Sequence, residues 1–157
     1  MFNKPPNEGE ALRKTAARFQ RIINKIVRMS QSPRDFGTGE PLPVAEIQII
    51  HTVGGNPNIT VTELSRQLGL TKGTVSPLVN KLVDKDYLRK TRSTQDGRKV
   101  QLGITDKGEI ASQGYEKYAE EYVSQYAQEI SYGEWVIVSE TLVKLEAFVD
   151  TKIQESP

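Results

Sequence analysis

The sequence predicts a mainly α-helical fold that carries one small β-hairpin. Apolar residues recur at spacings of three and four near both ends of the chain, which is the period of a helix. Between residues 60 and 84 a glycine separates two short helical patterns, and between 87 and 105 an Asp-Gly pair separates two strand patterns. In this order the pieces predict a winged helix-turn-helix held between N- and C-terminal dimerisation helices.

Composition limits what the protein can be. The chain has 157 residues, enough for one core with supporting helices, and no apolar run approaches the thickness of a bilayer. It has no cysteine, which excludes disulfides, a thiol redox switch and a thiolate metal site. The first residues, MFNKPPNEGE, lack an apolar signal core, so we expect a cytoplasmic protein.

The charge is unevenly distributed, although the net charge is only +1. Residues 1–65 carry +2, residues 66–105 carry +6, and residues 106–157 carry −7. A basic middle beside an acidic C-terminal part is typical of a module that faces a polyanion. Charge alone also fits a solvated surface with no partner.

The N-terminal part should form a helix and then a long loop. From about residue 10 to residue 29 the apolar positions form one stripe. Three prolines and two glycines then interrupt the pattern in SQSPRDFGTGEPLP. This loop is unusually long for a helical connection, so it has the length to lie over a neighbouring element. The stripe consists of Leu12, Ala16, Phe19, Ile23 and Ile26.

A second helix should begin at Pro43 and end at Gly54-Gly55-Asn56-Pro57. Proline suits the first position of a helix, where an N–H would have no partner. His51 is the single histidine, and on a helix flank it is more often packed or at the solvent edge than a ligand. Without cysteine or a second histidine we expect no metal site and no cofactor. The apolar side of the helix carries Val44, Ile47, Ile50 and Val53.

Two short helices around a tight turn follow. Thr60 and Glu63 fit a capping box at the start of the third helix. Gly69 should end that helix in the left-handed conformation, Leu70 should be buried in the turn, and Thr71 should cap the fourth helix. The third helix should present Val61, Leu64 and Leu68 to the core.

The fourth helix has an apolar side and a polar side of unusual composition. A face that met only solvent would carry long Glu and Lys side chains, which favour helix formation. This face carries short polar groups, which let a helix approach base edges closely in a major groove. We therefore predict a DNA-reading face, with a solvated face as the alternative. The apolar side is Val75, Leu78, Val79 and Leu82, and the reading face is Thr71, Lys72, Thr74, Ser76, Asn80 and Lys81.

Pro77 leaves the start of the fourth helix open. It cannot donate a hydrogen bond to the Gly73 carbonyl, and it disfavours a helical Ser76. Either the helix begins at Pro77 with Ser76 as its cap, or it runs from Thr71 with bent first turns. We prefer the second arrangement because Val75 already fits the apolar face.

A basic hairpin comes next. Residues 87–93 and 99–105 have the pattern of paired strands around Thr94-Gln95-Asp96-Gly97. Beside a helix-turn-helix such a hairpin can follow the DNA backbone, with the arginine of its tip in a minor groove. An ordinary edge hairpin protected by charge is the alternative. The cations are Arg89, Lys90, Arg92, Arg98 and Lys99.

Taken together, this stretch resembles the MarR-type winged helix-turn-helix transcriptional regulators. The resemblance implies a homodimer that binds a pseudo-palindromic operator in double-stranded DNA, as a repressor relieved by a small ligand. It implies that the fourth helix is the recognition helix, that Arg98 enters the minor groove, and that Asp96 and Gly97 support it. The matching pieces are LSRQLG at 64–69, TVS at 74–76, Leu78-Val79, Leu82, Arg92, Asp96-Gly97-Arg98, and Leu102-Gly103-Ile104-Thr105 leading to Lys107-Gly108.

The C-terminal part predicts two further helices that support dimerisation. The first and the last helix have the spacing of coiled-coil seams. The tyrosine stripe between them indicates packing within the chain or across a dimer, with a ligand pocket as the alternative. We therefore expect residues 1–34 and 106–157 to form the dimer around a DNA-binding region at 35–105, in one integrated domain. In the resembled family effectors often bind between these parts, and His51 and Tyr115 would line such a cleft. The apolar and aromatic positions are Tyr115, Tyr118, Tyr122 and Tyr126, then Trp135, Val138, Leu142, Leu145 and Val149.

The main alternative is a winged-helix module that binds another protein and has no sequence-specific DNA binding. Such a module would keep the core pattern but would not need Arg98 or the polar face from Ser76 to Asn80. An enzyme is disfavoured, because the sequence has no Gly-rich phosphate loop, no nucleophile motif and no second histidine. We therefore expect no catalytic residues.

Overall fold

Six helices and two small hairpins make up the described part of the chain, residues 9–30, 32–92 and 99–155 of this computed structural model. No helix in these ranges is both long enough and apolar enough to cross a membrane. The helices are α1 (Glu10–Ser30), α2 (Val44–Gly55), α3 (Val61–Gln67), α4 (Lys72–Asp84), α5 (Asp106–Gln128) and α6 (Tyr132–Glu155). The strands are β1 (Arg34–Asp35), β2 (Pro41–Leu42), β3 (Leu88–Arg92) and β4 (Val100–Ile104).

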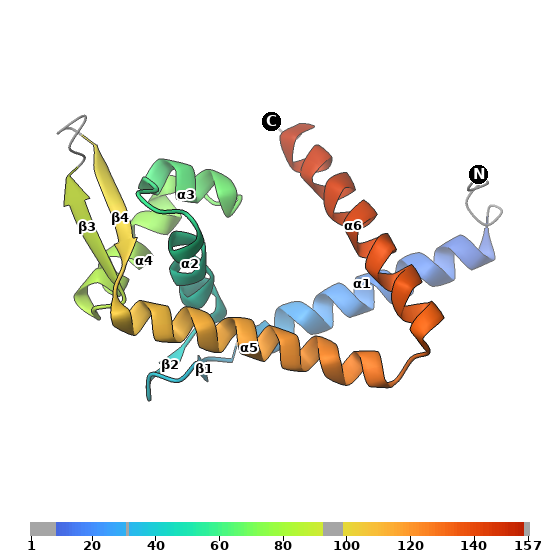
Figure 1. Ribbon diagram of the computed structural model, residues 1–157. Coiled ribbons are helices and arrows are strands. Elements are labelled where there is room, and N and C mark those ends of the chain that lie inside the picture. The colour runs from blue at the N-terminus through green and yellow to red at the C-terminus, as the bar shows by residue number, and fades with distance from the viewer. Residues whose placement is uncertain (1–8, 31, 93–98, 156–157) are drawn as a thin grey trace.

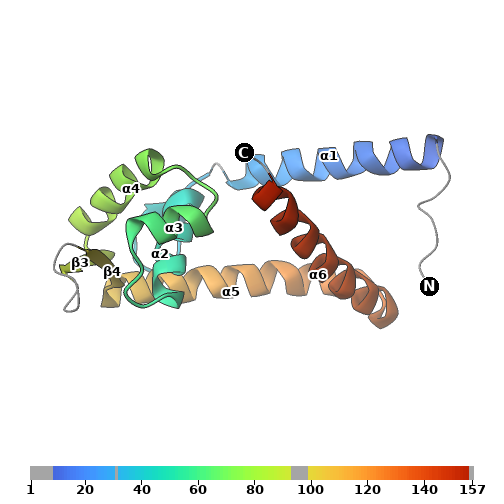
Figure 2. The same cartoon turned by 90° about the horizontal axis from the view of Figure 1, so that it is seen from above.

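These elements form a head and an arm, which Figures 1 and 2 show from two sides. The head consists of α2, α3, α4 and the β3–β4 hairpin. The arm consists of α1, α5 and α6. The long helix α5 runs out of the head, α6 starts at the far end of α5, and α1 runs from beside the head toward that same end. The mainly α-helical class with a hairpin wing is thus confirmed.

One hydrophobic core lies inside the head. Helix α2 is at its centre, and the side chains of Ile47, Ile49 and Ile50 are fully buried. The sequence predicted a one-sided α2 and missed Ile49, because α2 packs against α3, α4, α5 and β4 and so is buried on several faces. The buried apolar residues are Phe36, Leu42, Ile47, Ile49, Ile50, Val53, Ile59, Leu64, Val75, Val79, Leu82, Tyr87, Leu88, Leu102 and Ala111.

The segment predicted as a long loop contains a small antiparallel ladder, in which Arg34 pairs with Leu42. Phe36 lies between the two strands and is only 4% exposed. Its ring meets those of Tyr115 and Tyr118 on α5 edge-on, with centroids 5.7 and 6.2 Å apart. The segment therefore does cover a neighbouring helix, while its two-residue strands are too short to show a period in the sequence.

The helix-turn-helix has the predicted caps. The Thr60 hydroxyl accepts from the Glu63 N–H while the Glu63 carboxylate accepts from the Thr60 N–H, which is the capping box. Gly69 has φ of +64°, the left-handed value that ends such a helix without a steric cost. The prediction for Leu70 was wrong, because its side chain is 43% exposed.

The structure shows where α4 and α2 begin. Helix α4 begins at Lys72 after the Thr71 cap and continues through Pro77, so Ser76 is not a cap. Helix α2 begins one residue later than expected, with Pro43 as its N-terminal cap position.

The wing is a regular antiparallel pair, with Leu88 opposite Ile104 and Arg92 opposite Val100. A third segment joins it, since the Leu102 N–H donates to the Ile59 carbonyl at 2.8 Å. The hairpin is therefore anchored to the start of α3. The tip residues Asp96, Gly97 and Arg98 lie outside the described residues.

Candidate DNA-binding surface

The outer face of α4 carries most of the residues predicted to read DNA. Thr71, Lys72, Thr74 and Asn80 are exposed, and Ser76 is half-buried. Their orientation is fixed from behind, since Val75, Val79 and Leu82 on the other side of the helix are fully buried. The apolar side of α4 therefore holds a row of short polar groups toward the outside.

Three of these polar residues also make hydrogen bonds within the protein. The Thr71 hydroxyl accepts from the Thr74 N–H at 3.2 Å, and the two hydroxyl oxygens lie 2.8 Å apart. The Asn80 carbonyl oxygen accepts from Lys90 Nζ of β3 at 2.5 Å. Its NH₂ group keeps two donors, so Asn80 remains able to bond an acceptor on a base edge. Lys90 was counted with the basic hairpin, but its position beside the reading face was not predicted.

Lys81 is placed differently from its neighbours on α4. Its Nζ lies 2.5 Å from Oε1 of Glu46, a residue of α2 that is only 3% exposed. A buried carboxylate needs a partner, because charge is costly to move out of water. Lys81 therefore neutralises Glu46, a task that its place on the helix did not reveal.

A groove of about 630 Å³ opens between α3, the start of α4 and β4. It is lined by three cations, Arg66, Lys72 and Lys99. Glu63 also lines it, and the pKa of this carboxyl is lowered because the Thr60 N–H and hydroxyl donate to its charged form. Lys72 and Lys99 were predicted as DNA contacts and Arg66 was missed, although it is the only cation on α3.

The base of the wing is rigidly built. Arg89 donates from Nη1 to the Ile104 carbonyl at 2.5 Å, and its side chain lies over Gly103, which faces it across the ladder. Arg92 and Lys99 are exposed at the end of the ladder that leads to the tip. The predicted wing-tip residue Arg98, with Asp96 and Gly97, lies outside the described residues.

The wing meets α5 at a tight junction. Thr105 caps α5 by accepting from the Gly108 N–H at 3.0 Å, and its hydroxyl donates toward the carbonyl oxygens of Asp86 and Tyr87 at 2.6 and 3.0 Å. A Cβ at Gly108 would lie 2.2 Å from the Tyr87 carbonyl oxygen. Only glycine allows α5 to approach β3 this closely.

A second hollow, of about 330 Å³, lies between the arm and the head. Tyr115, predicted to line a ligand cleft, is part of its wall together with Phe36, Tyr118 and Arg34. His51 is not part of the wall. Its Nδ1 lies 3.0 Å from the Ser112 hydroxyl, and its ring centroid lies 5.4 Å from that of Tyr115.

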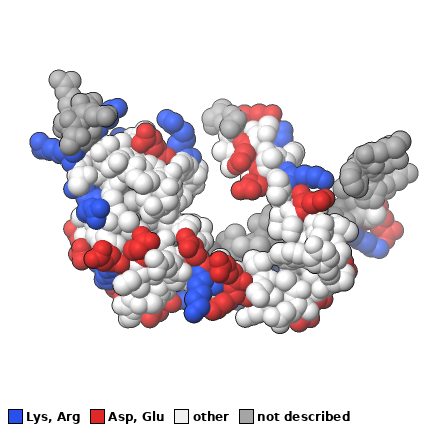
Figure 3. Space-filling model, viewed as in Figure 1, with Lys and Arg blue, Asp and Glu red and all other residues white. Residues whose placement is uncertain are grey.

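The distribution of charge follows the same division as the fold. In Figure 3 blue Lys and Arg side chains flank the head near the β3–β4 hairpin, and red Asp and Glu side chains follow the edge formed by α5. A surface of this kind presents its positive end to a polyanion.

A capped helix pair with a left-handed glycine turn, a polar outer face and an antiparallel basic hairpin defines a winged helix-turn-helix protein. The model of the MarR family matches residues 41–99. Over this region the chain is similar to the MarR-type winged helix-turn-helix transcriptional regulators.

Two kinds of relatives accompany this match. The HTH-type transcriptional regulator SarZ of Staphylococcus saprophyticus is 25% identical over 108 residues, 69% of this chain and 70% of that protein. Among solved structures, Streptococcus pneumoniae FabT in complex with DNA has a TM-score of 0.77 at 24% identity, over 89% of this chain and 98% of that one. The S. aureus MepR–DNA complex has a TM-score of 0.66 at 16% identity, over 86% and 97%.

Proposed function

We propose that this protein binds double-stranded DNA as a homodimer and reads a pseudo-palindromic operator with α4 and the β3–β4 wing. The observation that carries the proposal is the row of short polar side chains on α4, flanked by the groove of Arg66, Lys72 and Lys99. Short side chains suit base edges, and the cations suit the phosphates on either side. The solved DNA complexes of FabT and MepR, which share the fold, support the same partner.

Support for a homodimer comes from the apolar side chains of the arm. No residue of the buried core of the described chain lies on α1 or α6, and every residue from 10 to 28 is exposed. Phe19 and Ile26 on α1 are 46% and 57% exposed, and Leu142 on α6 is 57% exposed. Exposed apolar patches of this extent mark an interface. In this proposal residues 1–34 and 106–157 form the dimer and residues 35–105 bind DNA.

Dimerisation also supplies specificity. One winged module makes few base contacts, whereas two-fold symmetry lets both copies of α4 enter successive major grooves. The half-site centres should then lie about 10 base pairs apart. Selection of bound fragments from random DNA by the purified chain tests this directly, since enrichment of a palindrome with this spacing is the expected result.

The wing tip gives a sharper test. Arg98→Ala should weaken operator binding by about 1–3 kcal/mol and leave dimerisation unchanged, because a groove-inserted arginine contributes affinity without supporting the core. Fluorescence anisotropy titrations at matched salt measure the change. Unchanged affinity would show that the wing tip does not bind DNA.

Salt dependence separates this proposal from a protein-binding module. Phosphate contacts release counterions, so the logarithm of the affinity should fall steeply with the logarithm of the salt concentration. A flat response would favour a winged-helix protein-interaction module.

The proposal includes repression that a small ligand relieves. The hollow lined by Phe36, Tyr115 and Tyr118, with the Arg34 guanidinium 4.2 Å above the Tyr118 ring, offers an apolar site with one cation at the junction of arm and head. A ligand bound there would change the angle between the arm and the head. Reporter expression with and without the protein gives the sign of regulation, and Tyr115→Ala should abolish the response to an effector while operator binding persists.

A further inference from the structure

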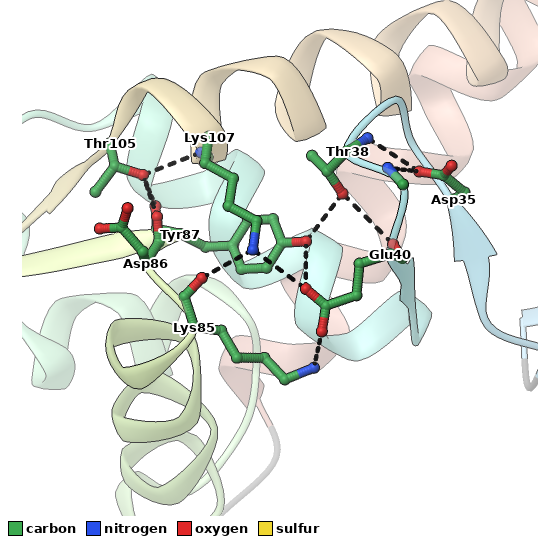
Figure 4. A network of polar contacts seen from close by, with 10 residues as sticks. Asp35, Thr38, Glu40, Lys85, Asp86, Tyr87, Thr105 and Lys107 are labelled. Carbon is green, nitrogen blue, oxygen red and sulfur yellow. Dashed lines mark hydrogen bonds and ion pairs between the residues drawn. The ribbon is translucent and has the colours of Figure 1, made fainter.

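Three segments meet at the carboxylate of Glu40, which lies in the turn between β1 and β2 (Figure 4). Lys85 Nζ lies 2.5 Å from Oε1, while Lys107 Nζ and the Tyr87 hydroxyl each donate to Oε2 at 3.2 Å. These hydrogen bonds hold the pKa of Glu40 down, from 4.5 to about 2, with the contact to Lys85 as the largest cause. Glu40 is therefore charged throughout the neutral range.

The two lysines belong to the ends of the two helices that matter most for DNA reading. Lys85 is the C-terminal cap of α4, and Lys107 lies in the first turn of α5. Lys107 Nζ also donates to the Lys85 carbonyl at 3.0 Å. The end of the recognition helix is thus joined to the start of the arm helix, both directly and through Glu40.

The segment that carries Glu40 is itself fixed. Oδ1 of Asp35 accepts from the N–H groups of Gly37, Thr38 and Gly39 at 2.9 to 3.0 Å. In the same turn Phe36 is buried against α5, as described above. Glu40 is therefore presented from a rigid base.

A second carboxylate holds α4 one turn earlier, where Lys81 pairs with the buried Glu46 of α2. Lys81 and Lys85 are four residues apart and so lie on one side of α4. Two anchors on one side of a helix fix both its rotation about its own axis and its tilt. The polar reading face is held in place by contacts made behind it.

We propose that Glu40 is a positioning residue for operator recognition, which sets the angle of α4 relative to α5. This inference rests on the proposed DNA-binding function. In a dimer built on the arm, that angle determines how far apart the two recognition helices lie. A fixed angle removes conformational freedom before binding and selects one half-site spacing.

Whether the loss of Glu40 raises or lowers the affinity for the operator distinguishes a positioning role from a purely electrostatic one. Glu40 is an anion close to cations of the head, so its removal should strengthen attraction to any polyanion. Positioning requires the opposite result for the operator alone. The informative quantity is therefore the ratio of the affinity for the operator to the affinity for unrelated DNA of the same length.

The test compares Glu40→Gln with wild type and with Glu109→Gln, in the full chain and at one salt concentration. Glu109 is an exposed carboxylate in the first turn of the same helix as Lys107, and the Gln113 amide donates to it at 3.3 Å, an interaction that glutamine can keep. Anisotropy titrations use the selected operator, the same operator with one base pair inserted between the half-sites, and unrelated DNA. A melting curve for each variant confirms that it is folded at the assay temperature.

In Glu40→Gln the operator affinity should fall about two- to thirtyfold, the range found for residues that couple two sites. Affinity for unrelated DNA should stay level or rise, and the preference over the inserted operator should shrink. Glu109→Gln should match wild type. An unchanged ratio, or an equal loss on all three DNAs, would overturn the proposal.

If Glu40→Gln fails to fold, Tyr87→Phe removes one hydrogen bond to the same carboxylate and one to Thr38 of the same turn, and keeps the buried ring. The ratio of operator affinity to affinity for unrelated DNA should then fall by a smaller factor than in Glu40→Gln. An unchanged ratio would count against positioning. A wild-type chain that prefers no sequence at all would instead refute the proposed function.

Discussion

The close approach of α5 to β3 makes Gly108→Ala the most informative single substitution for the fold. A methyl group there would lie 2.2 Å from the Tyr87 carbonyl oxygen and 2.7 Å from Cγ1 of Ile104. Since a Cβ atom essentially never comes within 3.0 Å of a non-bonded heavy atom, the helix would have to move by about 0.8 Å relative to the strand. Glycine to alanine ordinarily stabilises a helix by about 1 kcal/mol. Forced overpacking costs about 1–3 kcal/mol and more against backbone.

We therefore expect Gly108→Ala to lower the free energy of unfolding by about 1–2 kcal/mol, against the trend of helix propensity. Urea denaturation measures it, at one fixed protomer concentration because dimerisation contributes to stability. Gly133→Ala in α6 is the matched control, since a Cβ there meets nothing within 4 Å and should be neutral or stabilising. A Gly108→Ala protein as stable as wild type would refute the steric reasoning.

Three further predictions concern local features. The pKa of Glu40 is lowered to about 2 from an ordinary 4.5, so its contribution to stability is present above pH 4.5 and is lost as the pH falls toward 2. The difference in melting temperature between wild type and Glu40→Gln should therefore shrink over that range. Thr60→Ala removes the capping hydroxyl of α3 and should lower the free energy of unfolding by about 1 kcal/mol in urea. Pro77→Ala returns a hydrogen bond to the Gly73 carbonyl, so it should raise that free energy by about 1 kcal/mol; a less stable protein would contradict this account of α4.

Features that depend on neighbouring residues were visible in the sequence. The capping box at Thr60, the left-handed Gly69 and the spacing of Val75, Val79 and Leu82 each follow from local backbone chemistry. Together they located both helices of the reading head and the face that α4 turns outward.

Features that join distant segments were not visible. Glu46 and Lys81 are 35 residues apart, and Glu40 and Lys107 are 67 apart, so no local pattern links them. A glutamate in a helix or turn is ordinarily a solvated charge. Only the packed positions of α2, α4 and α5 reveal that these carboxylates hold α4 in place.

The segregation of charge between head and α5 also has a consequence for how the protein travels to its site. With a net charge of +1 the molecule as a whole is barely attracted to DNA, yet the +6 of residues 66–105 and the −7 of residues 106–157 give it a large electric dipole moment. The field around a duplex exerts a torque on such a dipole and turns the basic end inward within about a Debye length, roughly 8 Å at physiological salt. If the proposed function holds, a molecule near the duplex arrives with its head already facing the grooves, and salt should slow productive encounters far more than a charge of +1 implies.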